Sequence, residues 1–317
     1  MKNKRGIEFS FGWLFALVVG AAIIFLAIYA AVKFIGSEQN VQETEAAKQL
    51  DIILTPIETG YEEAKAVDSI EFPAVTRIYS NCSSEGNFGE QSIRISTLFG
   101  QKWQEQGLPI TSYNKYIFSP DVMQAKNIYV LSKQFKMPFK VANMLFIWSD
   151  KYCFIGMPAE IEKEVTDLNL KNINVTSNPD TCDAGSKKVC NVLNYDLPGC
   201  DIFVNPNAKS VVKSGKIVYY EGGLIYGAIF SEPEVYECQV KRLMKRTSEL
   251  ALLYKDKSGL IATKSDGCSS NLQGDLTGLA SAGGQITSSI ELRTINFIAE
   301  SLSSSHEQMT DCKLWGD

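Results

Sequence analysis

The longest apolar stretch of the chain lies near its N-terminus. Residues Phe9 to Val32 contain no charged side chain, and Trp13 and Tyr29 lie near the two ends of this run. A helix of this length extends about 36 Å at 1.5 Å per residue, enough to cross a hydrocarbon core of about 30 Å. The pattern therefore predicts one transmembrane helix over residues 9–32.

A cleaved signal peptide and a buried helix of a soluble protein are the other two interpretations of this run. A signal peptide has an apolar region of about 7–15 residues that ends at a small-x-small site. The run here is longer, and its AIYAAV end holds no clean Ala-x-Ala. Uncharged runs of this length are rare in soluble cores, so a retained membrane helix is the preferred interpretation.

The charges around the run predict its orientation. Lys2, Lys4 and Arg5 precede it in a basic stub over residues 1–8. Cationic residues are enriched on the cytoplasmic side of membrane helices. We therefore expect a single-pass protein of the cell membrane in contact with the lipid bilayer, with its N-terminus in the cytoplasm and its main domain outside.

Beyond the run, apolar residues recur at steps of three and four. Ala46, Leu50 and Ile57 belong to one such stripe. The spacing predicts an amphipathic helix over residues 33–68 that continues the membrane helix and lays one face on the following domain. Pro56 is expected to kink or interrupt this helix.

Residues 69–317 show strand and helix patterns without regular alternation. VLSKQF, NMLFIWS and YCFIG are rich in aromatic and β-branched residues and predict strands, and KSVVKSGKIVYYEGGLIYGAIF predicts two or three more. PAEIEKEVTDLNL, SEPEVYECQVKRLMKRTSELALLYK and SSIELRTINFIAESL predict helices, the last two with S-x-x-E capping boxes at Ser231/Glu234 and Ser288/Glu291. The fold class is α+β. Residues 178–206, rich in Asn, Asp, Gly, Pro and Cys, mark loops or a domain seam.

Composition is that of a globular protein with room for one large or two small domains. The chain has 317 residues, 45% of them hydrophobic, and a net charge of −5. Residues 1–35 hold four basic residues and one acidic residue, which leaves 27 basic and 35 acidic residues for the rest. An acidic main domain argues against nucleic acid as a partner, because phosphate binding needs a surplus of Lys and Arg.

All eight cysteines lie on the predicted outer side. An even number in an extracytoplasmic domain predicts up to four disulfides; free buried thiols are the alternative. With no C-x-x-C pair and a single histidine, the usual zinc spacings are absent. Asn81 and Asn174 lie in N-x-S/T tripeptides and are candidate glycosylation sites. The disulfide candidates are Cys82, Cys153, Cys182, Cys190, Cys200, Cys238, Cys268 and Cys312.

The sequence gives little support for a catalytic function. The one histidine, His306, lies in a serine-rich segment that leaves the last helix, where we expect a solvated side chain. No nucleophile elbow, Walker A loop or dinucleotide fingerprint is present. The sequence predicts no catalytic residue, metal site or cofactor.

One charge cluster could bind a partner. Four basic residues share a face of the helix that follows Pro233, and they could dock an acidic neighbour or anionic headgroups. The alternative is a face that is solvated or paired with carboxylates of the same domain. The four are Lys241, Arg242, Lys245 and Arg246.

Two resemblances extend these expectations. KRGIEF followed by an apolar helix resembles the start of type IV pilin-like proteins, which implies cleavage after Gly6, a new N-terminus at Ile7 and packing of the helix with other subunits. The glutamate of that family at the fifth position after the cut is Phe11 here, and the nearby acid is Glu8. MPFKVANMLFIWSDKYCFIGMPAEIE and AIFSEPEVYECQVKRLMKR resemble uncharacterised single-span exported proteins of small-genome archaea, which implies an envelope domain and no activity.

The leading expectation is a membrane-anchored structural or interaction protein of the cell envelope, such as a pilin-like or surface-assembly component that contacts other envelope subunits. A membrane-tethered enzyme with a carboxylate site and an envelope ligand-binding module are the two alternatives. Convergent acids in a deep cleft would favour the enzyme. An apolar or aromatic pocket would favour the binding module.

Overall fold

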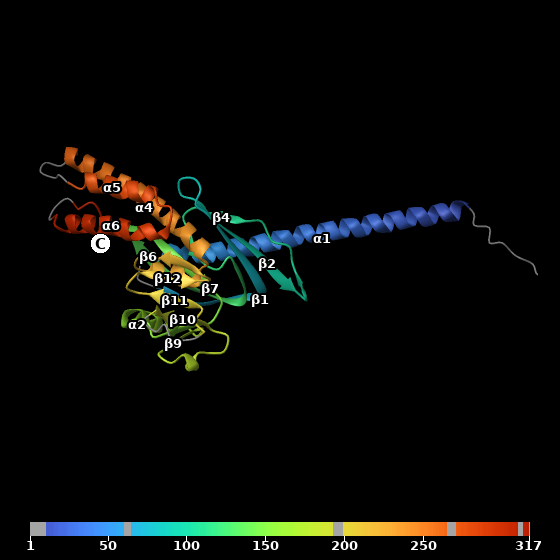
Figure 1. Ribbon diagram of the computed structural model, residues 1–317. Coiled ribbons are helices and arrows are strands. Elements are labelled where there is room, and N and C mark those ends of the chain that lie inside the picture. Colours follow the sequence, from blue (N-terminus) through green and yellow to red (C-terminus); the bar gives the residue numbers. More distant parts are fainter. Residues whose placement is uncertain (1–10, 60–64, 193–198, 265–270, 310–312, 317) are drawn as a thin grey trace, which may run out of the picture.

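The protein is a mixed α+β domain carried on one long helix (Figure 1). This computed structural model describes residues 11–59, 65–192, 199–264, 271–309 and 313–316. The α+β class and the apolar N-terminal helix predicted from the sequence are both confirmed.

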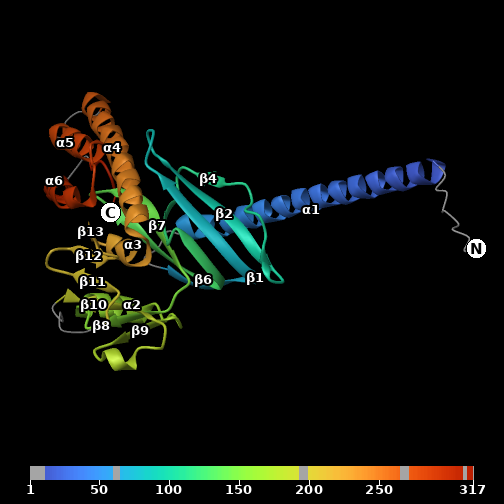
Figure 2. The ribbon, with the colours of Figure 1, turned by 45° about the vertical axis from the view of Figure 1, so that its right-hand side comes forward.

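Helix α1 (Phe11–Thr59) is unbroken over 49 residues. It joins the predicted apolar and amphipathic segments into one rod, half of which stands clear of the domain in Figures 1 and 2. The expected interruption at Pro56 is wrong, because the helix continues to Thr59. Proline removes a single backbone hydrogen bond, and here the loss falls in the last turns. The helix is also shorter than the predicted 33–68 segment, since a strand begins at Lys65.

A seven-stranded sheet packs on the C-terminal half of α1. Its strand order is β3-β2-β1-β6-β7-β5, with β4 paired to β2, and all pairs are antiparallel except β5 with β7. The strands are β1 (Lys65–Ser83), β2 (Glu90–Phe99), β3 (Lys102–Trp103), β4 (Ile110–Ser112), β5 (Tyr116–Phe118), β6 (Val122–Lys136) and β7 (Lys140–Trp148).

Alternation along β7 divides the core between the two faces of this sheet. Leu145 and Ile147 point to the α1 side, whereas Met144, Phe146 and Trp148 point to the opposite side. Successive strand residues face opposite ways, so a strand buried on both faces is apolar throughout. This explains why NMLFIWS contains no polar alternation.

A second sheet of six strands lies beyond the first. Its order is β13-β12-β11-β10-β8-β9, parallel from β9 to β11 and antiparallel from there to β13. The strands are β8 (Tyr152–Ile155), β9 (Ile173–Thr176), β10 (Lys187–Asn191), β11 (Ile202–Asn205), β12 (Ser210–Lys213) and β13 (Lys216–Tyr219). Within the described part of residues 178–206, β10 pairs with both β8 and β11 and is an inner strand of this sheet.

Helices fill the space beside the two sheets (Figure 2). They are α2 (Ala159–Asp167), α3 (Leu224–Phe230), α4 (Pro233–Lys264), α5 (Gln273–Gly284) and α6 (Leu292–Glu307), with short 3₁₀ turns η1 (Pro179–Thr181) and η3 (Ser289–Glu291). Helix α4 contacts β5, β1 and β7 of the first sheet and β13 of the second. The helices predicted after Pro158, Ser231 and Ser288 correspond to α2, α4 and α6.

Two local predictions are wrong. The third strand expected in the GGLIYGAIF segment is α3, whose seven residues are all buried; a short apolar run can be either a strand or a buried helix. Ser231 and Glu234 form no capping box. Ser231 Oγ instead donates to the Gly227 carbonyl at the end of α3, and Glu234 pairs with Lys216. The second box, at Ser288 and Glu291, is present.

Candidate functional site

The first half of α1 is the most exposed apolar surface of the described chain. Phe11–Lys33 is long and apolar enough to cross a membrane, and none of it is buried. Phe25 of this segment is 70% exposed. Such exposure is typical of a side chain that contacts a nonaqueous environment. Monomeric soluble proteins rarely expose such continuous apolar area. This segment therefore needs a covering environment.

The second half of α1 is held to the sheet by one apolar stripe. Ala47, Leu50 and Leu54 are buried against residues on the α1 side of the seven-stranded sheet, among them Ile95 and Leu145. Steps of three and four residues place these side chains on one helix face. The predicted amphipathic packing is therefore seen in this part of the helix.

Polar contacts also hold this part of α1 to the sheet. Asp51 pairs with buried Lys115, whose Nζ lies 2.6 Å from Asp51 Oδ1 and also donates to the Asp51 carbonyl at 2.7 Å. The buried Glu43 carboxylate accepts a short hydrogen bond from Thr97 Oγ1. A buried ion is costly unless it is paired, so the Lys115–Asp51 pair holds α1 at one height on the sheet, and the Thr97–Glu43 hydrogen bond adds a second contact.

Six of the predicted cysteines form three disulfides. Cys82–Cys238 joins β1 to α4, whereas the other two bridges stabilise one face of the second sheet. That face includes Cys153–Cys182 and Cys190–Cys200 with Ile155 and Phe203. Disulfides persist in oxidising compartments, so the bridges fit an extracytoplasmic domain.

Several predicted positions lie outside the described residues. These are Gly6, Ile7 and Glu8 of the candidate processing site and two cysteines, Cys268 and Cys312. Of the two sequons, Asn81 is exposed on β1 beside a bridged cysteine. Asn174 is half-buried on β9 and donates from Nδ2 to the Thr181 carbonyl.

One member of the predicted basic face of α4, Arg242, is turned inward and so cannot take part in docking. Arg242 is 0% exposed and donates to the carbonyls of Phe88, Lys115 and Tyr113. Helical spacing placed the four cations on one face, but that face packs against loops of the first sheet.

The neighbours of Arg242 are also engaged within the chain. Lys245 Nζ donates to the Ser84 and Gly86 carbonyls, and Arg246 Nε donates to the Val141 carbonyl at 2.9 Å. Lys241 is half-buried. Three of the four cations therefore join α4 to backbone carbonyls of loops and of β7.

His306 is buried, which contradicts the expectation of a solvated side chain. Its ring stacks on Trp315 with centroids 3.8 Å apart, and Nε2 accepts from the Leu314 amide at 3.0 Å. The imidazole thus holds the C-terminal segment against α6. No local sequence pattern predicts this role, because the contact forms only when the chain folds back and brings Leu314 and Trp315 onto His306.

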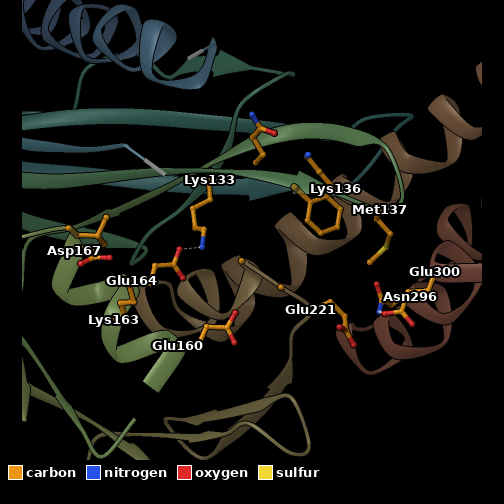
Figure 3. A pocket seen from close by; sticks show the side chains of 15 residues that line it. Lys133, Lys136, Met137, Glu160, Lys163, Glu164, Asp167, Glu221, Asn296 and Glu300 are labelled. Carbon is orange, nitrogen blue, oxygen red and sulfur yellow. Dashed lines mark hydrogen bonds and ion pairs between the residues drawn. The ribbon is translucent and has the colours of Figure 1, made fainter. Parts of the chain in front are cut away.

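A pocket of about 960 Å³ opens between the β6–β7 hairpin, α2, the start of α3 and α6 (Figure 3). Lys133 of β6 forms a short ion pair with Glu164 of α2, whose second oxygen accepts from Tyr226 OH at 2.6 Å. Burial and the Glu164 carboxylate raise the pKa of Tyr226, so its hydroxyl stays a donor. No sequence pattern predicted this pocket, because its residues come from four separate segments of the chain.

Two other pocket carboxylates also have partners within the chain. Buried Glu221 pairs with Lys209 at 2.5 Å, and Glu300 accepts from Asn296 Nδ2 at 2.8 Å. Figure 3 shows Glu160 between Glu164 and Glu221, and Lys136 beside Met137 on the hairpin. The pocket therefore combines acids engaged in internal contacts, two exposed acids (Glu160 and Asp167) and the apolar residues Phe135, Met137 and Leu168. Among the residues that the structure describes, no group of His, Cys, Asp and Glu is arranged to hold a metal ion.

No protein-family model matches this chain, and neither the curated proteins nor the solved structures contain a significant match. The class that fold and site define is thus a domain with an N-terminal apolar helix and three disulfides, which fits a single-pass membrane protein with an oxidised outer domain.

Proposed function

We propose that this protein is a membrane-anchored structural or interaction component of the cell envelope, built in the manner of pilin-like surface proteins. The observation that carries the proposal is α1 itself. One continuous helix leaves its first half without any buried residue and packs its second half on a sheet through a single stripe. Such a rod anchors a folded head at a fixed distance from the bilayer.

The engaged acids of the pocket support this choice over a tethered enzyme. A tethered enzyme would need carboxylates that are available to a substrate, and a binding module would need an apolar or aromatic lining. Glu164, Glu221 and Glu300 each accept a hydrogen bond or ion pair from the protein, whereas Glu160 and Asp167 line the pocket as exposed carboxylates. We therefore place the function in the anchored helix and the exported head.

N-terminal sequencing and intact mass of the membrane-extracted full chain test the proposal. A start at Ile7 supports pilin-like processing, and an intact Met1 or Lys2 supports a plain anchor. A start near Ala31 would show that the apolar helix is removed and would overturn the proposal. The mass change on reduction and alkylation counts the bridges, of which we expect at least the three described.

A further inference from the structure

The turn between β2 and β3 carries an exposed aromatic and cationic tip. We define the β2–β3 tip as residues 99–103. Phe99 is 79% exposed, although large aromatic side chains are usually covered. Lys102 is exposed, and Trp103 is half-buried with the Arg77 guanidinium 3.9 Å above its ring.

Contacts with α1 set the position of this tip. Thr97, two residues before Phe99, bonds Glu43, and the Leu108 amide donates to Thr44 Oγ1 at 2.9 Å. Gly107 touches the same turn of α1, where an added Cβ would lie 2.6 Å from the Thr44 nitrogen. The segment is therefore anchored to the helix at residues 43–44.

The tip points toward the exposed end of α1. Ser112, opposite Gln91 near the start of β2, contacts Asp51, whereas Thr97 near its end contacts Glu43. Strand β2 consequently runs toward the N-terminal half of α1, as Figures 1 and 2 show.

The distance along α1 between the end of the apolar segment and the β2–β3 tip matches the thickness of a lipid headgroup layer. Lys33, where the apolar segment ends, precedes Glu43 by about 15 Å of helix. Two strand residues carry the chain from Thr97 to Phe99, up to about 7 Å in the same direction. The gap of roughly 10 Å is spanned by one headgroup layer of about 5–8 Å together with the aromatic side chain.

The charges near the tip suit an anionic surface. Between Gln91 and Trp103 the chain holds Arg94 and Lys102 and no acidic residue; Glu105 follows two residues after Trp103, and Glu43 of α1 is bonded to Thr97. The opposite end of β2 carries Glu85 and Glu90 together with Arg242 and Lys245 of α4, so its distance from the apolar segment of α1, and not its charge, distinguishes it. Aromatic rings and cations near a bilayer gain from headgroup contact and from anionic lipids.

We propose that the β2–β3 tip rests on the headgroups of an anionic membrane surface and thereby fixes the orientation of the domain on its anchor. The inference depends on the proposed function, since α1 must first be held in the bilayer. The tip adds a second contact to the helix, so the domain lies against the membrane on one defined side.

Site-specific photo-crosslinking tests this contact. The full chain is reconstituted in phosphatidylcholine vesicles with about 30% phosphatidylglycerol, with p-benzoylphenylalanine replacing Phe99, Phe88 or Phe25 one at a time. Phe25 lies in the apolar segment of α1 and reports the anchor, whereas Phe88 is a 41% exposed aromatic at the opposite end of β2.

We expect lipid adducts at positions 25 and 99, with at least about fivefold more at 99 than at 88. Lys102→Glu should reduce the adduct at 99 by about half or more through repulsion from anionic lipid, while leaving position 25 unchanged. Adducts at 25 with equal yields at 99 and 88, or protein–protein adducts at 99, would overturn the tip contact alone. Absence of adducts at 25 would overturn the anchor as well.

Discussion

Arg242 is buried among backbone carbonyls that belong to loops and strand ends. Its guanidinium donates to three of them and to Gln239 Oε1, and it lies 4.9 Å from the centre of the Tyr116 ring. Burial lowers the pKa of Arg242 to about 10, so the group remains protonated at neutral pH. Five N–H donors in a fixed fork make arginine suited to this position.

Arg242→Met should lower the free energy of unfolding by about 3 kcal/mol, because buried carbonyls lose their donors. Lys241→Gln, one residue earlier on α4, is the matched control and should change stability by less than about 0.5 kcal/mol. Denaturant titration of the full chain in detergent measures both. Equal stability of the two variants would contradict the structural role of Arg242.

Helix α1 shows at the scale of an element how one helix serves two surroundings. Between Glu43 and Leu54, one face packs on the sheet and the other face keeps apolar residues exposed, such as Ile52 at 66%. Hydrophobic periodicity alone cannot say which of two apolar stripes meets the domain. The sheet decides it, since Ile95 and Leu145 meet the stripe of Leu50 and Leu54.

Leu54→Ala should destabilise the domain by about 2–5 kcal/mol, because it removes a fully buried side chain and leaves a cavity. Ile52→Ala on the same helix should cost less than about 1 kcal/mol in the monomer. Thermal unfolding and limited proteolysis of the full chain compare the variants. If Ile52→Ala were the more damaging change, the assignment of the packed face would be wrong.

The whole molecule is held together by long-range links between its layers. Cys82–Cys238 closes a loop of 156 residues and connects the first sheet to α4, whereas Cys190–Cys200 closes a loop of ten within one sheet. Chain entropy makes the longer loop the more stabilising one, since its closure constrains more of the unfolded chain.

Removing the bridge between layers should therefore cost more stability than removing the short one. The loop-length relation gives about 5 kcal/mol for Cys82→Ala with Cys238→Ala and about 3 kcal/mol for Cys190→Ala with Cys200→Ala. Equilibrium unfolding without reductant measures the two losses. A larger loss from the Cys190–Cys200 pair would show that local packing outweighs loop closure.

The sequence by itself determined the apolar helix, the α+β class, the strands of the VLSKQF, NMLFIWS and YCFIG segments and the capping box at Ser288. Each of these depends on periodicity or on neighbours a few residues apart, which local spacing records. The sequence also predicted disulfides, because cysteine pairing follows from compartment and count, although not the partners.

Only the tertiary structure decided what surrounds each side chain. It buried Arg242 and His306, made a helix of Leu224–Phe230, placed Cys82 beside Cys238 and ran β2 toward the exposed half of α1. All of these depend on segments far apart in the chain. A residue's neighbours across such distances are fixed by the packing of whole layers, which no local pattern records.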